Sequence, residues 1–111
     1  MVAVCAAIPA MAEFKAEFNT AEATAINITE AGEYHVYNEL FSQTNVPVVV
    51  NADIADTVFV TVEGANIVLA EDGSAMNIGA NSVVVLNLKG INAFKGKNGC
   101  GIGAAGERNL C

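Results

Sequence analysis

The stretch Val60-Thr61-Val62-Glu63-Gly64-Ala65-Asn66 returns 26 residues later as Leu86-Asn87-Leu88-Lys89-Gly90-Ile91-Asn92. In both copies, alternating apolar and polar residues lead into a Gly-x-Asn sequence. Alternation with a period of two is typical of a β-strand that buries one face. Glycine and asparagine close together are typical of a turn. The repeat therefore predicts an all-β fold that uses one strand-and-corner unit twice.

A repeat of this length, with short β runs and a turn in each unit, predicts a solenoid. One coil cannot bury its own apolar face, so coils must stack on their neighbours. We expect a short right-handed parallel β-helix of about three coils, with equivalent residues of successive coils lying above one another. The inward rows would then place Val60 over Leu86 and Val62 over Leu88.

The same period can be projected in both directions. One period back, Tyr34 and Val36 align with Val60 and Val62, which predicts a weaker earlier coil without the corner glycine. Forward, residues 75–79 are echoed by residues 100–103, about 24 residues later.

The projection also predicts which side chains face outward. The outward rows are expected to be Phe59 with Val85, His35 with Thr61 and Asn87, and Tyr37 with Glu63 and Lys89. In the last row Glu63 and Lys89 should form a weak cross-coil ion pair. Asn66 and Asn92 should stack at one corner, where asparagine can adopt a left-handed backbone conformation.

Composition limits the classes of protein that this chain can belong to. The 111 residues are 53% hydrophobic and 15% charged, so they form one ordered domain with a large apolar interior. Five Lys and Arg against twelve Asp and Glu give a net charge of −7. That balance argues against nucleic acid and anionic lipid surfaces as partners, because both require a basic footprint. The acidic residues are spread along the chain, which favours a solubilising role.

Residues 1–12 read MVAVCAAIPAMA and form an apolar segment distinct from the single β-solenoid domain expected over residues 13–111. Ala10-Met11-Ala12 fits the small-x-small pattern that precedes a signal-peptidase cut, here ahead of Glu13, although the basic start of a leader is missing. The segment is too short to span a bilayer. Two interpretations stay open: the back half of a leader, or an apolar arm that packs on a partner.

The three cysteines, Cys5, Cys100 and Cys111, show neither CxxC nor Cys/His spacing, so the sequence predicts no zinc site. In an exported protein Cys100 and Cys111 could close a short C-terminal loop. The alternative is three buried free thiols.

The second repeat resembles a known family. Val84-Val85-Leu86-Asn87-Leu88-Lys89-Gly90-Ile91-Asn92, followed by Gly99-Cys100-Gly101-Ile102-Gly103, is similar to the parallel β-helix repeats of secreted bacterial surface proteins that are described as carbohydrate-binding or adhesin-like. The resemblance covers residues 24–105 and implies a β-helix on a secreted or cell-surface protein. Family members usually continue for several more coils, so the resemblance also implies a fragment or a short stack capped by a partner.

Motifs for catalysis and cofactor binding were sought and not found, so the sequence predicts a protein that is not an enzyme and holds no cofactor. His35 lacks a Ser or Cys partner in a nucleophile context, and it is expected to point outward or to neighbour Tyr37. Residues 99–103 lack the GK[ST] sequence of a phosphate loop. Polysaccharide-cleaving β-helices need clustered Asp, Arg and Lys, whereas only Lys89, Lys95 and Lys97 lie near one another here.

Two acidic pairs were considered as calcium ligands. Asp53 with Asp56, and Glu71 with Asp72, match neither the EF-hand nor the nonapeptide calcium repeat. We interpret both pairs as solvated turns and predict no metal site.

Two hypotheses for function follow. The first is a non-catalytic structural or binding module of a secreted or surface protein that binds glycan or another protein through a β-helix face. The second is an oligomeric structural subunit, such as a phage capsid decoration or fibre protein, in which residues 1–12 pack against neighbouring copies. The high apolar content, with Phe59, Val85 and Phe94 needing cover, favours self-association.

Overall fold

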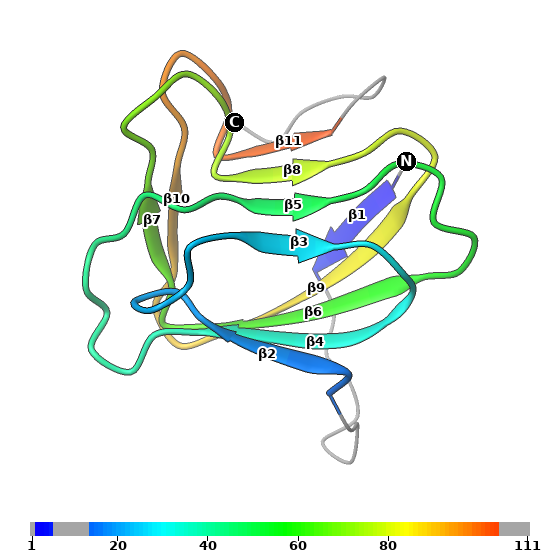
Figure 1. Cartoon of the computed structure of the whole chain (residues 1–111), viewed down its shortest axis with the longest axis horizontal. Coiled ribbons are helices and arrows are strands. Elements are labelled where there is room, and N and C mark those ends of the chain that lie inside the picture. Colours follow the sequence, from blue (N-terminus) through cyan, green and yellow to red (C-terminus); the bar gives the residue numbers. More distant parts are fainter. Residues whose placement is uncertain (1, 6–13, 105–111) are drawn as a thin grey trace.

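The chain was analysed as a computed structural model, which describes residues 14–104 and the backbone of residues 2–5. Within these ranges the fold is all β (Figure 1). The strands are β1 (Val2–Cys5), β2 (Ala16–Asn19), β3 (Ile26–Ile28), β4 (Gly32–Tyr37), β5 (Val48–Val50), β6 (Val58–Glu63), β7 (Asn66–Val68), β8 (Met76–Ile78), β9 (Val83–Lys89), β10 (Ala93–Lys95) and β11 (Ile102–Ala104).

The strands form three parallel sheets that the chain visits in turn. Sheet A has the order β1-β9-β6-β4-β2, sheet B has the order β11-β8-β5-β3, and sheet C contains β10 and β7. One coil runs through β6, β7 and β8, and the next runs through β9, β10 and β11. Figure 1 shows sheets A and B on two sides of the stack and sheet C closing a third. The expected parallel β-helix of about three turns is therefore confirmed.

The predicted register of sheet A is also confirmed. Val60 is the cross-strand partner of Tyr34 on one side and of Leu86 on the other, and Val62 is the partner of Val36. Their side chains point inward because alternate residues of a strand face opposite sides. The fully buried large side chains come from sheets A, B and C and are Ile26, Ile28, Val36, Val48, Val50, Val58, Val60, Val62, Ile67, Met76, Ile78 and Leu86.

Leu88 departs from the prediction. It is the cross-strand partner of Val62 as expected, but 44% of its surface is exposed, whereas Val62 is fully buried. Val62 has a coil on each side. Leu88 lies in the last coil, and the described part of β1 pairs with β9 from Val83 to Leu86. The end of the stack, rather than the alternation, decides the exposure of Leu88.

The burial of Thr61, on the outer face of sheet A, also differs from the prediction. Thr61 was expected to face solvent but is only 3% exposed, because His35 and Asn87 flank it in neighbouring strands.

On the inner side of β4, the Tyr34 hydroxyl donates a hydrogen bond to the Glu30 carbonyl at 2.8 Å. Burial raises the pKa of Tyr34 above its ordinary value, and the neighbouring charges act in opposite directions, with Lys15 lowering it and Glu30 raising it.

The corner after sheet A matches the prediction at its two glycines but not at its two asparagines. Gly64 and Gly90 adopt the left-handed conformation, with φ of 72° and 67°, which glycine enters without strain. Asn66 does not stack on Asn92, because Asn66 is the cross-strand partner of Ala93. The last coil contains one more residue between its corner glycine and its sheet C strand.

Asn92 fills the corner with hydrogen bonds instead. Its side-chain oxygen accepts a hydrogen bond from the Ala65 N–H at 2.9 Å, and its amide donates to the carbonyls of Val62 and Lys89. The echo of residues 75–79 in residues 100–103 is confirmed by the pairing of β8 with β11, but Met76 pairs with Ile102, so the offset is 26 residues rather than about 24.

Strand β1 lies at the opposite edge of sheet A from β2, which is the next strand in the sequence. It pairs in parallel with β9, Val2 with Val83 and Cys5 with Leu86, while β2 pairs with β4. In Figure 1 these two blue strands occupy opposite edges of sheet A. Part of the segment interpreted from sequence as a leader or an arm thus covers the edge of β9, and the proposed cut ahead of Glu13 lies outside the described residues.

Cys100 is disulfide-bonded. This rules out the alternative of three free thiols that was drawn from the sequence, and the closed C-terminal loop stays a prediction. Cys111, the partner suggested there, lies outside the described residues.

The contrast between Leu86 and Leu88 can be tested by truncation. Leu86→Ala should lower the free energy of unfolding by about 2 to 5 kcal/mol, because it leaves a cavity in a fully buried row. Leu88→Ala, the matched control two residues along the same strand, should lower it by less than about 1 kcal/mol. Urea denaturation followed by circular dichroism measures both, and equal losses would contradict the described end of the stack.

The two corner glycines offer a second test. Alanine at either position meets the left-handed backbone, which costs about 1 to 2 kcal/mol. At Gly64 a Cβ would also lie 2.7 Å from the Asn38 carbonyl oxygen, whereas at Gly90 nothing lies within 4 Å. Gly64→Ala should therefore lower the melting temperature more than Gly90→Ala in a thermal melt, and the reverse order would show that the coils are not in contact there.

Candidate functional site

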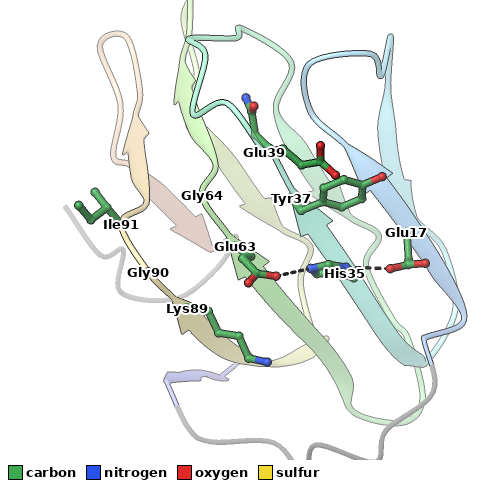
Figure 2. A pocket seen from close by; sticks show the side chains of 10 residues that line it. Glu17, His35, Tyr37, Glu39, Glu63, Gly64, Lys89, Gly90 and Ile91 are labelled. Atoms are coloured by element: carbon green, nitrogen blue, oxygen red, sulfur yellow. Dashed lines mark hydrogen bonds and ion pairs between the residues drawn. The ribbon is translucent and has the colours of Figure 1, made fainter.

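A groove of about 650 Å³ lies on the outer face of sheet A, beside the corner that leads to sheet C (Figure 2). Its size is within the roughly 300 to 1,000 Å³ typical of small-molecule sites. Its lining residues come from four successive strands and from the turns that follow them: Glu17, His35, Tyr37, Asn38, Glu39, Glu63, Gly64, Lys89, Gly90 and Ile91.

The register of the coils brings these side chains together. Glu17 on β2 is the cross-strand partner of His35 on β4, and Tyr37 is the partner of Glu63 on β6, which in turn pairs with Lys89 on β9. All five are at outward positions of the pleat. Residues far apart in sequence therefore form two short rows on the outer face of sheet A. Neighbouring residues within a row lie about 4.8 Å apart, which is the spacing of the strands.

His35 joins three coils. Its Nδ1 lies 2.9 Å from Oε1 of Glu17, and its Nε2 lies 3.0 Å from Oε1 of Glu63. Ionised carboxylates only accept hydrogen bonds, so both contacts form together when the imidazole carries a proton on each nitrogen. The imidazole is then a charged bridge between two half-exposed carboxylates, and we call the three residues the Glu17–His35–Glu63 bridge.

An aromatic stack crosses this bridge along β4. The imidazole of His35 lies between the rings of Phe14 and Tyr37, with centroid separations of 4.8 Å and 4.9 Å and interplanar angles of 18° and 23°. The expectation that His35 neighbours Tyr37 is confirmed. Rings at these separations attract one another, so the stack holds the imidazole between the two carboxylates.

The expected ion pair between Glu63 and Lys89 does not form. The two residues are cross-strand partners, but the Glu63 carboxylate is bonded to His35 instead. Within the described residues the side chain of Lys89 makes neither an ion pair nor a hydrogen bond, although its carbonyl accepts one from Asn92. Glu39 is likewise exposed and unpaired among them. The rim of the groove therefore carries charges that are available to a ligand.

Both nitrogens of His35 are engaged by carboxylates. Among the residues that the structure describes, there is no group of three or more His, Cys, Asp and Glu side chains suited to hold a metal ion.

The acidic pairs considered from sequence lie elsewhere and act locally. Asp53 accepts a hydrogen bond from Asn81, and Asp72 accepts one from Asn98, both at 2.8 Å. Asp53, Asn81 and Asn98 adopt left-handed conformations, so these residues build turns. Gly99 and Gly101 pack against backbone atoms of residues 73 and 94, which fits a tight turn.

Three contributors to the site were missed from the sequence: Phe14, Glu17 and Glu39. Glu17 precedes its partner His35 by 18 residues, so a period of 26 does not place it. Glu39 lies in a turn, outside the strand alternation. A search for short first coils could have found Glu17, because residues 16–19 alternate in the same manner as β4.

Comparison with protein-family models, curated proteins and solved structures gives no match for this chain. The fold and the groove define a short parallel β-helix with a polar, aromatic-lined groove on its widest sheet. The function is therefore inferred from the groove.

The contribution of the Glu17–His35–Glu63 bridge can be measured. His35→Phe keeps the aromatic stack but removes both hydrogen bonds, so the free energy of unfolding should fall by about 1 kcal/mol. Asn87→Ala, in the same row but without a side-chain hydrogen bond among the described residues, should change it by less than about 0.5 kcal/mol. Urea denaturation is the measurement, and a His35→Phe variant as stable as the parent would show that the bridge contributes nothing.

Proposed function

We propose that this chain is a non-catalytic binding module that binds glycan in the groove of sheet A. The observation that carries the proposal is the partly exposed ring of Tyr37, which lies in a groove whose rim carries three carboxylates and a lysine. A sugar ring presents an apolar face of C–H groups and an edge of hydroxyl groups. An aromatic ring beside hydrogen-bonding side chains matches both.

The side chains of the groove suit hydroxyl groups. Carboxylates of Glu39 and Glu63 accept hydrogen bonds from hydroxyls, while Lys89 donates to hydroxyl oxygens. The parallel strands hold Glu63 and Lys89 on a rigid sheet, and Glu39 lies in the turn that follows β4. A ligand therefore meets a site whose main-chain geometry is already formed, which limits the entropy lost on binding.

A secreted or cell-surface location is part of the proposal. The disulfide bond at Cys100 supports it, because disulfides persist in oxidising compartments. The resemblance of residues 84–92 and 99–103 to repeats of secreted bacterial surface proteins points the same way. Within the described residues there is no helix long and apolar enough to cross a membrane.

A second candidate function is an oligomeric structural subunit, such as a capsid decoration or fibre protein. Exposed apolar side chains near the corner of sheets A and C favour it, since Leu40 is 84% exposed and Ile91 is 78% exposed. Light scattering after size exclusion separates the two: a stable trimer that retains Met1 favours the subunit, and a monomer favours the glycan-binding module.

The glycan proposal predicts selective loss of binding. On a glycan array the protein should bind at least one class of oligosaccharide. Tyr37→Ala should weaken that binding about tenfold, since an aromatic contact contributes up to about 1.5 kcal/mol. Phe41→Ala is the matched control, because Phe41 is an exposed aromatic residue outside the groove. A blank array, or equal loss in both variants with unchanged melting temperatures, would contradict the proposal.

A further inference from the structure

The charges of the groove are unequal. Glu17, Glu39 and Glu63 contribute three carboxylates, against one lysine, Lys89, and the imidazole of His35. His35 is shared between Glu17 and Glu63, so it offsets at most one of their charges. Figure 2 shows Lys89 extending away from the end of the groove where Tyr37 and Glu39 lie. That end is therefore acidic and aromatic.

The carboxylates at this end keep free acceptor oxygens. Glu39 makes neither a hydrogen bond nor an ion pair among the described residues. Glu63 uses Oε1 for His35, and its Oε2 has no partner among the same residues. Tyr37 has one face against His35, at a centroid separation of 4.9 Å. A ligand can therefore reach two carboxylates and an aromatic ring together.

This combination selects for a cation. An ammonium group is attracted to the face of an aromatic ring by about 0.5 to 1 kcal/mol at an exposed site, and hydrogen bonds between an ammonium and a carboxylate are about twice as strong as neutral ones. The net charge of −7 adds a long-range attraction for cations and a repulsion for acidic sugars.

We propose that the ligand of this groove is an oligosaccharide that carries protonated amines, with one amine placed between Glu39, Glu63 and the Tyr37 ring. This inference rests on the proposed glycan-binding function and narrows it to one chemical class. Neutral and acidic saccharides offer these carboxylates hydrogen bonds from hydroxyl groups, but not the stronger charge-assisted hydrogen bonds of an ammonium group. An acidic saccharide would in addition bring like charges together.

The test uses the full chain and two oligosaccharides of equal length that differ only at nitrogen. A de-N-acetylated glucosamine oligomer and its fully N-acetylated counterpart are titrated by calorimetry, at a pH where the sugar amines are protonated. The amine form should bind at least about tenfold more tightly, equivalent to about 1.4 kcal/mol. Added salt should reduce this preference, because the charges are exposed.

Variants assign the preference to the groove. Glu39→Gln should reduce the preference for the amine form about threefold to tenfold, as expected for loss of one charge-assisted contact. Glu71→Gln is the matched control: it also neutralises an exposed turn carboxylate, outside this groove. An unchanged preference in Glu39→Gln would overturn the assignment of the amine to this end of the groove.

The outcomes separate the two proposals. Equal binding of both oligomers, or tighter binding of the acetylated one, would overturn the amine-bearing ligand and leave glycan binding standing. If neither oligomer binds but a neutral hexose oligosaccharide does, the proposed amine-bearing ligand is likewise overturned and glycan binding still stands. If no saccharide binds at all, glycan binding itself fails.

Discussion

The parallel, in-register pairing of β2, β4, β6 and β9 is the constraint on which the rest of the structure depends. Neighbouring strands lie about 4.8 Å apart, and a shift of one residue would turn every inward valine outward. Because Val36, Val60, Val62 and Leu86 are fully buried, the hydrophobic effect fixes that register. Sheets B and C then close over the same interior. The edge of the last coil would expose unpaired backbone groups, and β1 covers it along Val83 to Leu86.

The groove is a consequence of the same pairing. Once the inner rows are fixed, the outer rows follow, and they place Glu17, His35 and Glu63 on three successive strands within hydrogen-bonding distance. Left-handed glycines at Gly64 and Gly90 turn the chain away from the sheet just beyond these rows. Both glycines line the groove, and at Gly64 the missing side chain leaves room for the Asn38 carbonyl. The fold thus builds a polar groove from the outer rows of sheet A and from the turns that follow β4, β6 and β9.

Sequence periodicity predicted the stacked coils because the alternation and the corner glycines of residues 60–66 recur in residues 86–92. It could not predict where Asn66 and Asn92 lie, since one additional residue in the last coil shifts the register of sheet C. Sequence periodicity also failed to predict exposure and hydrogen bonding where these depend on neighbours outside a residue's own row. Leu88 is exposed because the stack ends there, and Glu63 bonds diagonally to His35 rather than directly across to Lys89. Glu17 escaped the projection because the first coil is shorter than the repeat.

Nuclear Overhauser contacts in solution test the in-register stacking most directly, because they report which backbone atoms of neighbouring strands are close. With isotope-labelled protein, parallel stacking predicts contacts from Thr61 to both His35 and Asn87, and from Val49 to Asn77 in sheet B. Contacts shifted by one residue, or a pattern typical of antiparallel hairpins, would contradict the stacked coils and the groove built on them.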